Sequence, residues 1–176
     1  VYLDCEHKYP EALETFEAAH QELNEDWGNE AYRAINQHYR ARSLFALGRE
    51  REALPLYIEA NRGFRNWLRP GDPDQVSLLR DLSQIFYTVG DASQSIAAAL
   101  SALEGLEDKY EFGDPRTAQY ANYIAQLYEI LGQHQDAVTY YEYALNLCAA
   151  NGELISNAYQ ACIQDFSGPR RSHLSE

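Results

Sequence analysis

The sequence contains no methionine, only three cysteines and only two lysines among its 176 residues. The absence of methionine, even at residue 1, predicts an excised piece of a longer protein or a processed product. Cys5, Cys148 and Cys162 form no CxxC pair, and any disulfide scheme leaves one of them unpaired. We therefore expect free thiols in a reducing compartment, which favours a cytoplasmic location.

Long apolar runs are also missing. The longest, IAAALSAL at residues 96–103, is far shorter than the roughly 20 residues that a membrane-spanning helix needs. The formal charge of −13 disfavours binding to nucleic acid or to an anionic membrane surface. Nucleic-acid binding in particular needs many lysine and arginine contacts to phosphate groups. We expect the acidity to lie on solvated helix faces, where it keeps the protein apart from its neighbours.

Motifs that carry catalysis or bind metal are absent as well. Cys5 and His7 lack a second pair of ligands at a useful spacing. No serine lies in a GxSxG motif. The acidic run of Glu22, Glu25 and Asp26 lacks the glycine-bearing loop of a calcium site. The sequence therefore predicts a protein that is not an enzyme and that has no cofactor and no metal site.

What the sequence does contain is a repeat with a period of 42 residues. Glycine follows an apolar residue at Gly48, Gly90 and Gly132, and the tripeptide GDP occurs at 71–73 and 113–115. Small residues keep the same step, with alanine or serine at residues 53, 95 and 137 and alanine at residues 60, 102 and 144. Self-similarity at a period of roughly 20–50 residues is typical of stacked repeat proteins.

Each repeat is predicted to be a pair of helices. Ala121, Ile124, Ala125 and Tyr128 fall three and four residues apart, which is the spacing of one helix face. An Asp-Pro pair, as at 72–73 and 114–115, suits a helix start, because aspartate accepts from the first amides and proline fits the first turn. The glycine of each repeat then ends the first helix in a left-handed conformation.

Small residues in the second helix predict how the pair packs. In LGQHQDAVTYYEYAL, residues 131–145, Ala137 and Ala144 mark a close approach and Tyr141 fills the adjacent gap. Antiparallel helices reach a separation of about 8–10 Å only where one of them presents small residues. One hairpin cannot bury its apolar face alone, so neighbouring hairpins must stack on it. The predicted fold class is all-α, an α-solenoid of antiparallel helix hairpins.

The pattern G/A–x–x–Y/F followed by G–x–x–x–x–A–x–x–x–Y/F–x–x–A resembles the tetratricopeptide repeat, over roughly residues 8–150. The matching positions in the three units are Ala41, Leu44, Gly48, Ala53, Tyr57 and Ala60; Ser83, Phe86, Gly90, Ser95, Ala99 and Ala102; and Ala125, Tyr128, Gly132, Ala137, Tyr141 and Ala144. The second unit departs most from this pattern, at Ser95 and Ala99. We expect its second helix to pack more closely or more loosely against its neighbours.

The repeat length refines this resemblance. The period of 42 residues exceeds the usual period of about 34 by roughly one turn per helix. With the Asp-Pro start, it is similar to the long-helix branch found in kinesin light chains and bacterial regulators. The resemblance implies a right-handed superhelix. The predicted array covers residues 1–166, as a partial unit at 1–27, units at about 28–70, 71–112 and 113–152, and a closing helix at 153–166. Residues 167–176 are predicted to be a disordered tail.

The resemblance also implies that the first helices of successive units line a concave groove. Guanidinium and amide groups can bond a peptide main chain, aromatic rings can hold its side chains, and arginine can grip a carboxylate in two places. We therefore expect the groove to bind an extended or helical segment of a partner protein, acidic or amide-rich. By register its residues are His38, Arg42, Phe45, Arg80, Gln84, Tyr87, Asn122, Gln126 and Glu129.

These features favour a non-enzymatic scaffold for protein–protein interaction, whose rigid surface lets a partner bind at little ordering cost. One alternative is a ligand-sensing regulatory domain of a larger protein, either a peptide receptor or an effector-fused regulator, because long-helix repeats resemble those of such proteins. Another is a structural subunit docked permanently on a second chain, which a large exposed apolar stripe would favour. An enzyme would need a pocket of converging polar groups, and the sequence indicates none.

Overall fold

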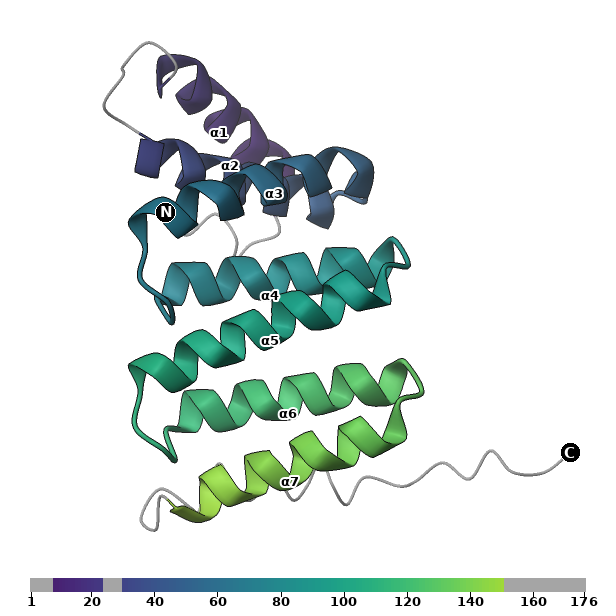
Figure 1. Cartoon of the computed structure of the whole chain (residues 1–176). Helices are drawn as coiled ribbons and strands as arrows, with labels where there is room; N and C mark the ends of the chain where they lie inside the picture. The colour runs from purple at the N-terminus through teal and green to yellow at the C-terminus, as the bar shows by residue number, and fades with distance from the viewer. Residues whose placement is uncertain (1–7, 24–29, 151–176) are drawn as a thin grey trace, which may run out of the picture. The chain divides into compact units, whose positions relative to one another are not determined.

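The computed structural model describes residues 8–23 and 30–150, and each regular element in them is an α-helix. The helices are α1 (Tyr9–Leu23), α2 (Glu30–Ala46), α3 (Glu50–Trp67), α4 (Pro73–Thr88), α5 (Ala92–Lys109), α6 (Pro115–Ile130) and α7 (His134–Ala150) (Figure 1). The all-α prediction is confirmed for these residues. The predicted closing helix at 153–166, the tail at 167–176, Cys5, His7, Cys162 and the side chains of the acidic run at 22–26 lie outside the described residues.

The helices belong to two compact units, residues 1–109 and residues 110–176. In the first unit α1 packs on α2, α2 on α3, α3 on α4 and α4 on α5, and α2 also reaches α4 (Figure 1). In the second unit α6 packs on α7. Helices that follow each other in each unit therefore pack as neighbours, which is the arrangement of a helical repeat. The right-handed superhelix and the boundaries of the repeat units stay predictions.

The turn inside each hairpin is built the same way three times. Gly48, Gly90 and Gly132 have φ angles of +73°, +87° and +75°, in the left-handed region that favours glycine. The amide after each glycine donates to a carbonyl five residues back, which closes the helix end as a Schellman motif. These bonds run from Arg49 N to Leu44 O (2.9 Å), from Asp91 N to Phe86 O (2.8 Å) and from Gln133 N to Tyr128 O (2.9 Å). The predicted glycine stops are confirmed.

Aspartate caps the first helix of the last two hairpins, as predicted. Asp72 Oδ1 accepts from the amide of Asp74 at 3.1 Å, and Asp114 Oδ1 accepts from the amide of Arg116 at 2.9 Å. A proline follows each capping aspartate as the first helical residue. The Arg116 guanidinium also donates to both carboxylate oxygens of Asp114, at 2.9 and 2.7 Å, and this lowers the pKa of Asp114 below its ordinary value.

Small buried residues line the contact between the helices of each hairpin. Ala53 and Ala60 of α3 and Ala137 and Ala144 of α7 are all buried. In the second hairpin a hydrogen-bonded serine pair takes the place of alanine. Ser83 and Ser95 are both 0% exposed, Ser95 Oγ donates to the Ser83 carbonyl at 2.7 Å, and the two hydroxyl oxygens lie 3.3 Å apart. Two hydroxyls are tolerated in this core because each finds a partner on the facing helix.

Two glycines let α5 rest on the turn between α3 and α4. Gly71 has a φ of +74°, and a Cβ at Gly71 would collide with the backbone oxygen of Gly105. A Cβ at Gly105 would lie 2.5 Å from the Gly71 nitrogen, closer than real Cβ atoms approach other atoms. Backbone meets backbone here, so both positions need the space that glycine leaves.

We expect Gly105→Ala to lower the free energy of unfolding of the first unit by about 1–3 kcal/mol, because neither backbone can give way without moving α5. Helix propensity alone predicts the opposite sign, a gain of about 1 kcal/mol for alanine over glycine in a helix interior. Urea denaturation measures the difference. Ser101→Ala, at an exposed position of α5, is the control and should change the value by less than about 0.5 kcal/mol. A Gly105→Ala variant as stable as the wild type would contradict the close contact.

Candidate functional site

The predicted groove residues of α4 form an exposed stripe. Arg80, Gln84 and Tyr87 follow each other at steps of four and three residues and are all exposed, Tyr87 to 43%. Leu82 and Ser83, which lie between them in sequence, are buried, and Ser83 contacts Ser95 of α5. The packing of α4 therefore leaves a cation, an amide and an aromatic ring together on its open face.

The predicted groove residues of α2 are less accessible. Arg42 and Phe45 are half-buried, and His38 is only 4% exposed. The centroid of the His38 ring lies 5.9 Å from those of Tyr57 and Phe64, both in α3. The expectation that His38 lines an accessible groove is therefore wrong, because its ring is buried against α3. We use the name groove surface for Arg42, Phe45, Arg80, Gln84 and Tyr87.

A buried carboxylate from α4 also contacts His38. The Asp81 side chain is 10% exposed, and its Oδ2 lies 3.0 Å from His38 Nε2 and 3.9 Å from Arg42 Nε. An acid in an apolar interior needs such partners, because an unpaired buried charge is costly. The contact joins the first hairpin to the second and holds Arg42 beside α4.

The predicted groove residues of α6 belong to the second unit. Asn122 and Gln126 are half-buried, and Glu129 is exposed. Glu129 Oε2 accepts a hydrogen bond of 2.8 Å from the hydroxyl of Tyr141 in α7. Tyr141, predicted to fill the gap between the two helices, is half-buried and reaches across its own hairpin to α6. Glu129 is therefore already engaged inside its own hairpin.

The described residues offer little for metal chemistry. Within residues 8–23 and 30–150, no three histidine, cysteine, aspartate or glutamate side chains cluster closely enough to hold a metal ion. Cys148 is a buried thiol. None of the described helices combines the length and the apolar character needed to cross a membrane.

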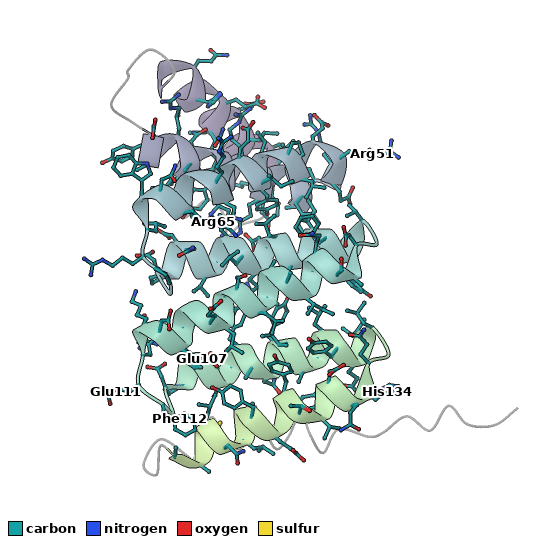
Figure 2. All side chains as sticks on the ribbon, viewed as in Figure 1. Arg51, Arg65, Glu107, Glu111, Phe112 and His134 are labelled. Atoms are coloured by element: carbon teal, nitrogen blue, oxygen red, sulfur yellow. The ribbon has the colours of Figure 1, made fainter. Side chains whose placement is uncertain are left out.

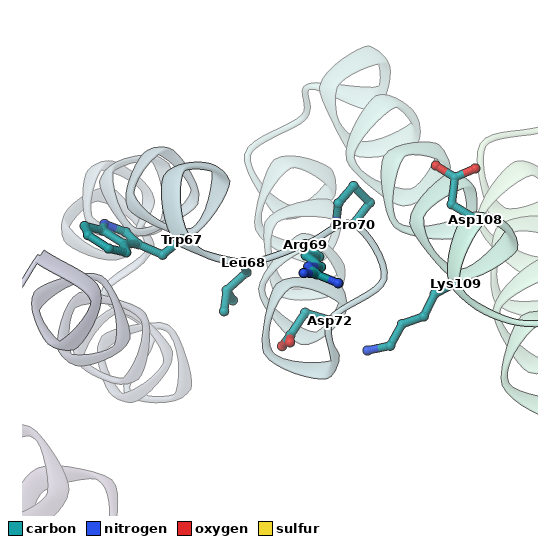
Figure 3. Close-up of a pocket in the computed structure, with 7 residues that line it drawn as sticks. All are labelled: Trp67, Leu68, Arg69, Pro70, Asp72, Asp108 and Lys109. Atoms are coloured by element: carbon teal, nitrogen blue, oxygen red, sulfur yellow. The ribbon is translucent and has the colours of Figure 1, made fainter.

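A cavity of about 590 Å³ opens where the end of α3, the following turn and the end of α5 meet (Figure 3). Trp67 in its wall is 58% exposed. Figure 3 shows the charged ends of Asp72 and Lys109 on the same side of the turn, with Asp108 pointing away. The cavity was not predicted, because its lining residues other than Asp72 come from outside the repeat pattern. The lining residues are Trp67, Leu68, Arg69, Pro70, Asp72, Asp108 and Lys109.

We expect Asp81→Ala to lower the free energy of unfolding of the first unit by about 1–3 kcal/mol, because it leaves buried His38 without its acceptor. Asp81→Asn should cost less, since the amide oxygen still accepts from the imidazole. Chemical denaturation measures both values. Asp108→Ala, the same change at an exposed site of α5, is the control. If Asp81→Ala and Asp108→Ala are equally stable, the contact between the hairpins does not depend on Asp81.

No protein-family model and no curated protein matches the sequence. Solved structures do match the fold. A putative kinesin light chain of Podosopora anserina with nearly identical TPR-like repeats has a TM-score of 0.76 at 20% identity, with 88% of this chain and 74% of that one covered. A variant of that protein matches with a TM-score of 0.75 at the same identity and coverage.

BtubC (BKLC) from P. vanneervenii also matches, with a TM-score of 0.71 at 22% identity. The match covers 85% of this chain but only 61% of BtubC. The similarity therefore extends over most of the chain, while the identity is low in every case. The chain has a tetratricopeptide-like repeat fold similar to that of kinesin light chain, as the sequence resemblance predicted.

Proposed function

We propose that the chain is a non-enzymatic scaffold for protein–protein interaction, and that a segment of a partner protein binds to the groove surface of α2 and α4. The observation that carries this proposal is the stripe of Arg80, Gln84 and Tyr87, exposed on a helix that is otherwise packed against its neighbours. Stacked helix hairpins suit a protein partner, because they present an extended and curved surface rather than an enclosed cleft. By register, Asn122, Gln126 and Glu129 occupy the equivalent positions on α6 of the second unit.

The three side chains offer different contacts to such a segment. The Arg80 guanidinium can hold a carboxylate with two parallel hydrogen bonds. The Gln84 amide has both donors and an acceptor, so it can bond a peptide group of the partner. The Tyr87 ring offers apolar area with a polar tip. Seven residues of helix span about 10 Å, so these groups suit a short segment with an acidic side chain at one end.

The guanidinium of Arg42 is less available to a partner's carboxylate than that of Arg80. Its Nε lies 3.9 Å from Asp81 Oδ2, so part of its charge already stabilises the contact between the hairpins. Replacing Arg42 by glutamate would place a second carboxylate beside the buried one and destabilise the fold. Arg80 makes no ion pair with another described residue. Arg80 is therefore the cleaner position at which to test carboxylate recognition.

We expect Arg80→Glu with Tyr87→Ala to weaken partner binding by about tenfold or more, because charge reversal repels the acidic group and truncation removes an aromatic anchor. The partner segment is first mapped on a peptide array after affinity capture with the chain. Titration calorimetry with the mapped peptide then gives the dissociation constants.

The matched control is Gln133→Glu with Gln135→Glu, two exposed positions, one just before α7 and one in its first turn. This pair lowers the net charge by the same amount as Arg80→Glu and should bind the peptide like the wild type. Circular dichroism checks that every variant stays folded. Unchanged affinity in a folded Arg80→Glu, Tyr87→Ala variant would reject the groove surface as the binding site.

A further inference from the structure

The arginines of this acidic chain are concentrated in the first full hairpin. Residues 28–70 carry eight arginines and four glutamates, with no lysine and no aspartate, which gives this segment a formal charge of +4. The whole chain has a formal charge of −13. The hairpin of α2 and α3 is therefore a basic island, and an acidic partner would be attracted to it locally.

Three of these arginines lie on one face of α3, which we name the arginine face: Arg51, Arg62 and Arg65. All three are exposed, and so are Pro55 and Ile58 between them. At about 100° per residue these five positions fall within a quarter of the helix circumference, and at 1.5 Å per residue they extend over about 21 Å. Figure 2 labels Arg51 and Arg65 towards opposite ends of α3.

Two of the four carboxylates of the hairpin bind side chains outside this face. Glu52 accepts from the Arg49 guanidinium at 2.8 and 2.7 Å, and Glu59 accepts from the Gln37 amide of α2 at 2.8 Å. Among the described residues, none of the three arginines of the arginine face makes an ion pair or a side-chain hydrogen bond. Their guanidinium groups are therefore available to an external acid.

Carboxylates of α5 lower the positive potential at one end of the arginine face. Arg65 lines a cavity of about 260 Å³ together with Glu104 and Asp108. These two carboxylates reduce the positive potential on that side of Arg65. Arg51, Ile58 and Arg62 are not among the residues that line this cavity. The attraction for an acidic partner is therefore strongest along the row from Arg51 to Arg62, with Arg65 at its border.

We propose that the arginine face is a docking surface for an acidic amphipathic helix of a partner protein. Pro55 leaves the Arg51 carbonyl without its helical donor, but the rest of the interior backbone of α3 is bonded within its own helix, so it offers little to the main chain of an extended peptide. A helix needs no such contact, because its own backbone is already satisfied. A helix also has the same rise per residue as α3, so its side chains can match the row one for one.

The order of side chains specifies the partner further. An antiparallel helix with carboxylates at positions i, i+3 and i+14 would face Arg65, Arg62 and Arg51, and an apolar residue at i+7 would face Ile58. Arginine can bind each carboxylate in a bidentate manner. A nucleic acid or an anionic membrane surface fits less well. The net charge of −13 repels an extended polyanion, and the apolar side chain of Ile58 cannot bind a phosphate group.

The experiment uses the whole chain and a designed alanine-rich helical peptide that carries glutamate at i, i+3 and i+14 and leucine at i+7. Fluorescence anisotropy measures binding of the labelled peptide at low salt. We expect saturable binding that weakens as salt is added, because the contacts are exposed ion pairs. A peptide with glutamine in place of glutamate should bind about tenfold more weakly or worse.

Arg62→Gln with Arg65→Gln should weaken binding of the glutamate peptide by about tenfold or more. Gln133→Glu with Gln135→Glu lowers the net charge equally and should leave binding unchanged. Equal affinities of these two double variants would overturn the proposal. It would also be overturned by failure of the peptide to bind, or by tighter binding of duplex DNA or phosphatidylserine vesicles under the same conditions.

This proposal concerns a different helix from the groove surface and does not depend on the proposed function. Arg80→Glu separates the two sites. The variant should lose the partner segment mapped for the groove but keep the designed helix. If Arg80→Glu abolishes binding of the designed helix while Arg62→Gln with Arg65→Gln does not, the peptide binds at α4 and the arginine face is not the site.

Discussion

The structure depends on one constraint: a hairpin of two helices has more apolar surface than it can bury by itself. Within a hairpin, small residues let the two helices pack closely. Ala41, Ala53 and Ala60 are all 0% exposed where α2 meets α3. The apolar surface that remains is buried against the next hairpin. In the first unit this contact includes the backbone approach of Gly71 to Gly105 and the buried contact of Asp81 with His38.

Stacking then decides which side chains a partner can reach. His38 of α2 is covered by aromatic rings of α3 and by Asp81 of α4, and Arg42 lies near the same carboxylate. α4 keeps a wider open face, so Arg80, Gln84 and Tyr87 are exposed. Equivalent positions in successive repeats therefore differ in accessibility, although the repeat pattern treats them alike.

The local features of the fold could be predicted from the sequence because they depend on neighbouring residues. The glycines at 48, 90 and 132 end helices in one conformation, and Asp72 and Asp114 cap helices through amides two residues away. Contacts between repeats could not be predicted in the same way. His38 and Asp81 are 43 residues apart, and only the packing of α2 against α4 brings them together.

The candidate surfaces, too, could be predicted only as far as they depend on residues close together in the sequence. Arg80, Gln84 and Tyr87, which register places on one side of α4, are exposed, but register could not show that His38 on α2 is buried. The arginine spacing in α3 is visible in the sequence. Its significance depends on burial and on the partners of Glu52 and Glu59, and both are properties of the folded hairpin.

The uneven distribution of charge follows from the same architecture. A chain with a net charge of −13 avoids most acidic neighbours at long range, but a segment of charge +4 fixed on a rigid hairpin can still select an acidic group at short range. Such a surface favours orientation and specificity over raw affinity, because wrong approaches meet like charge. Since α2 packs between α1 and α3, and α3 in turn on α4, the basic hairpin is held in a fixed place within the first unit. The stack of helices therefore converts a local bias in sequence composition into a directional surface.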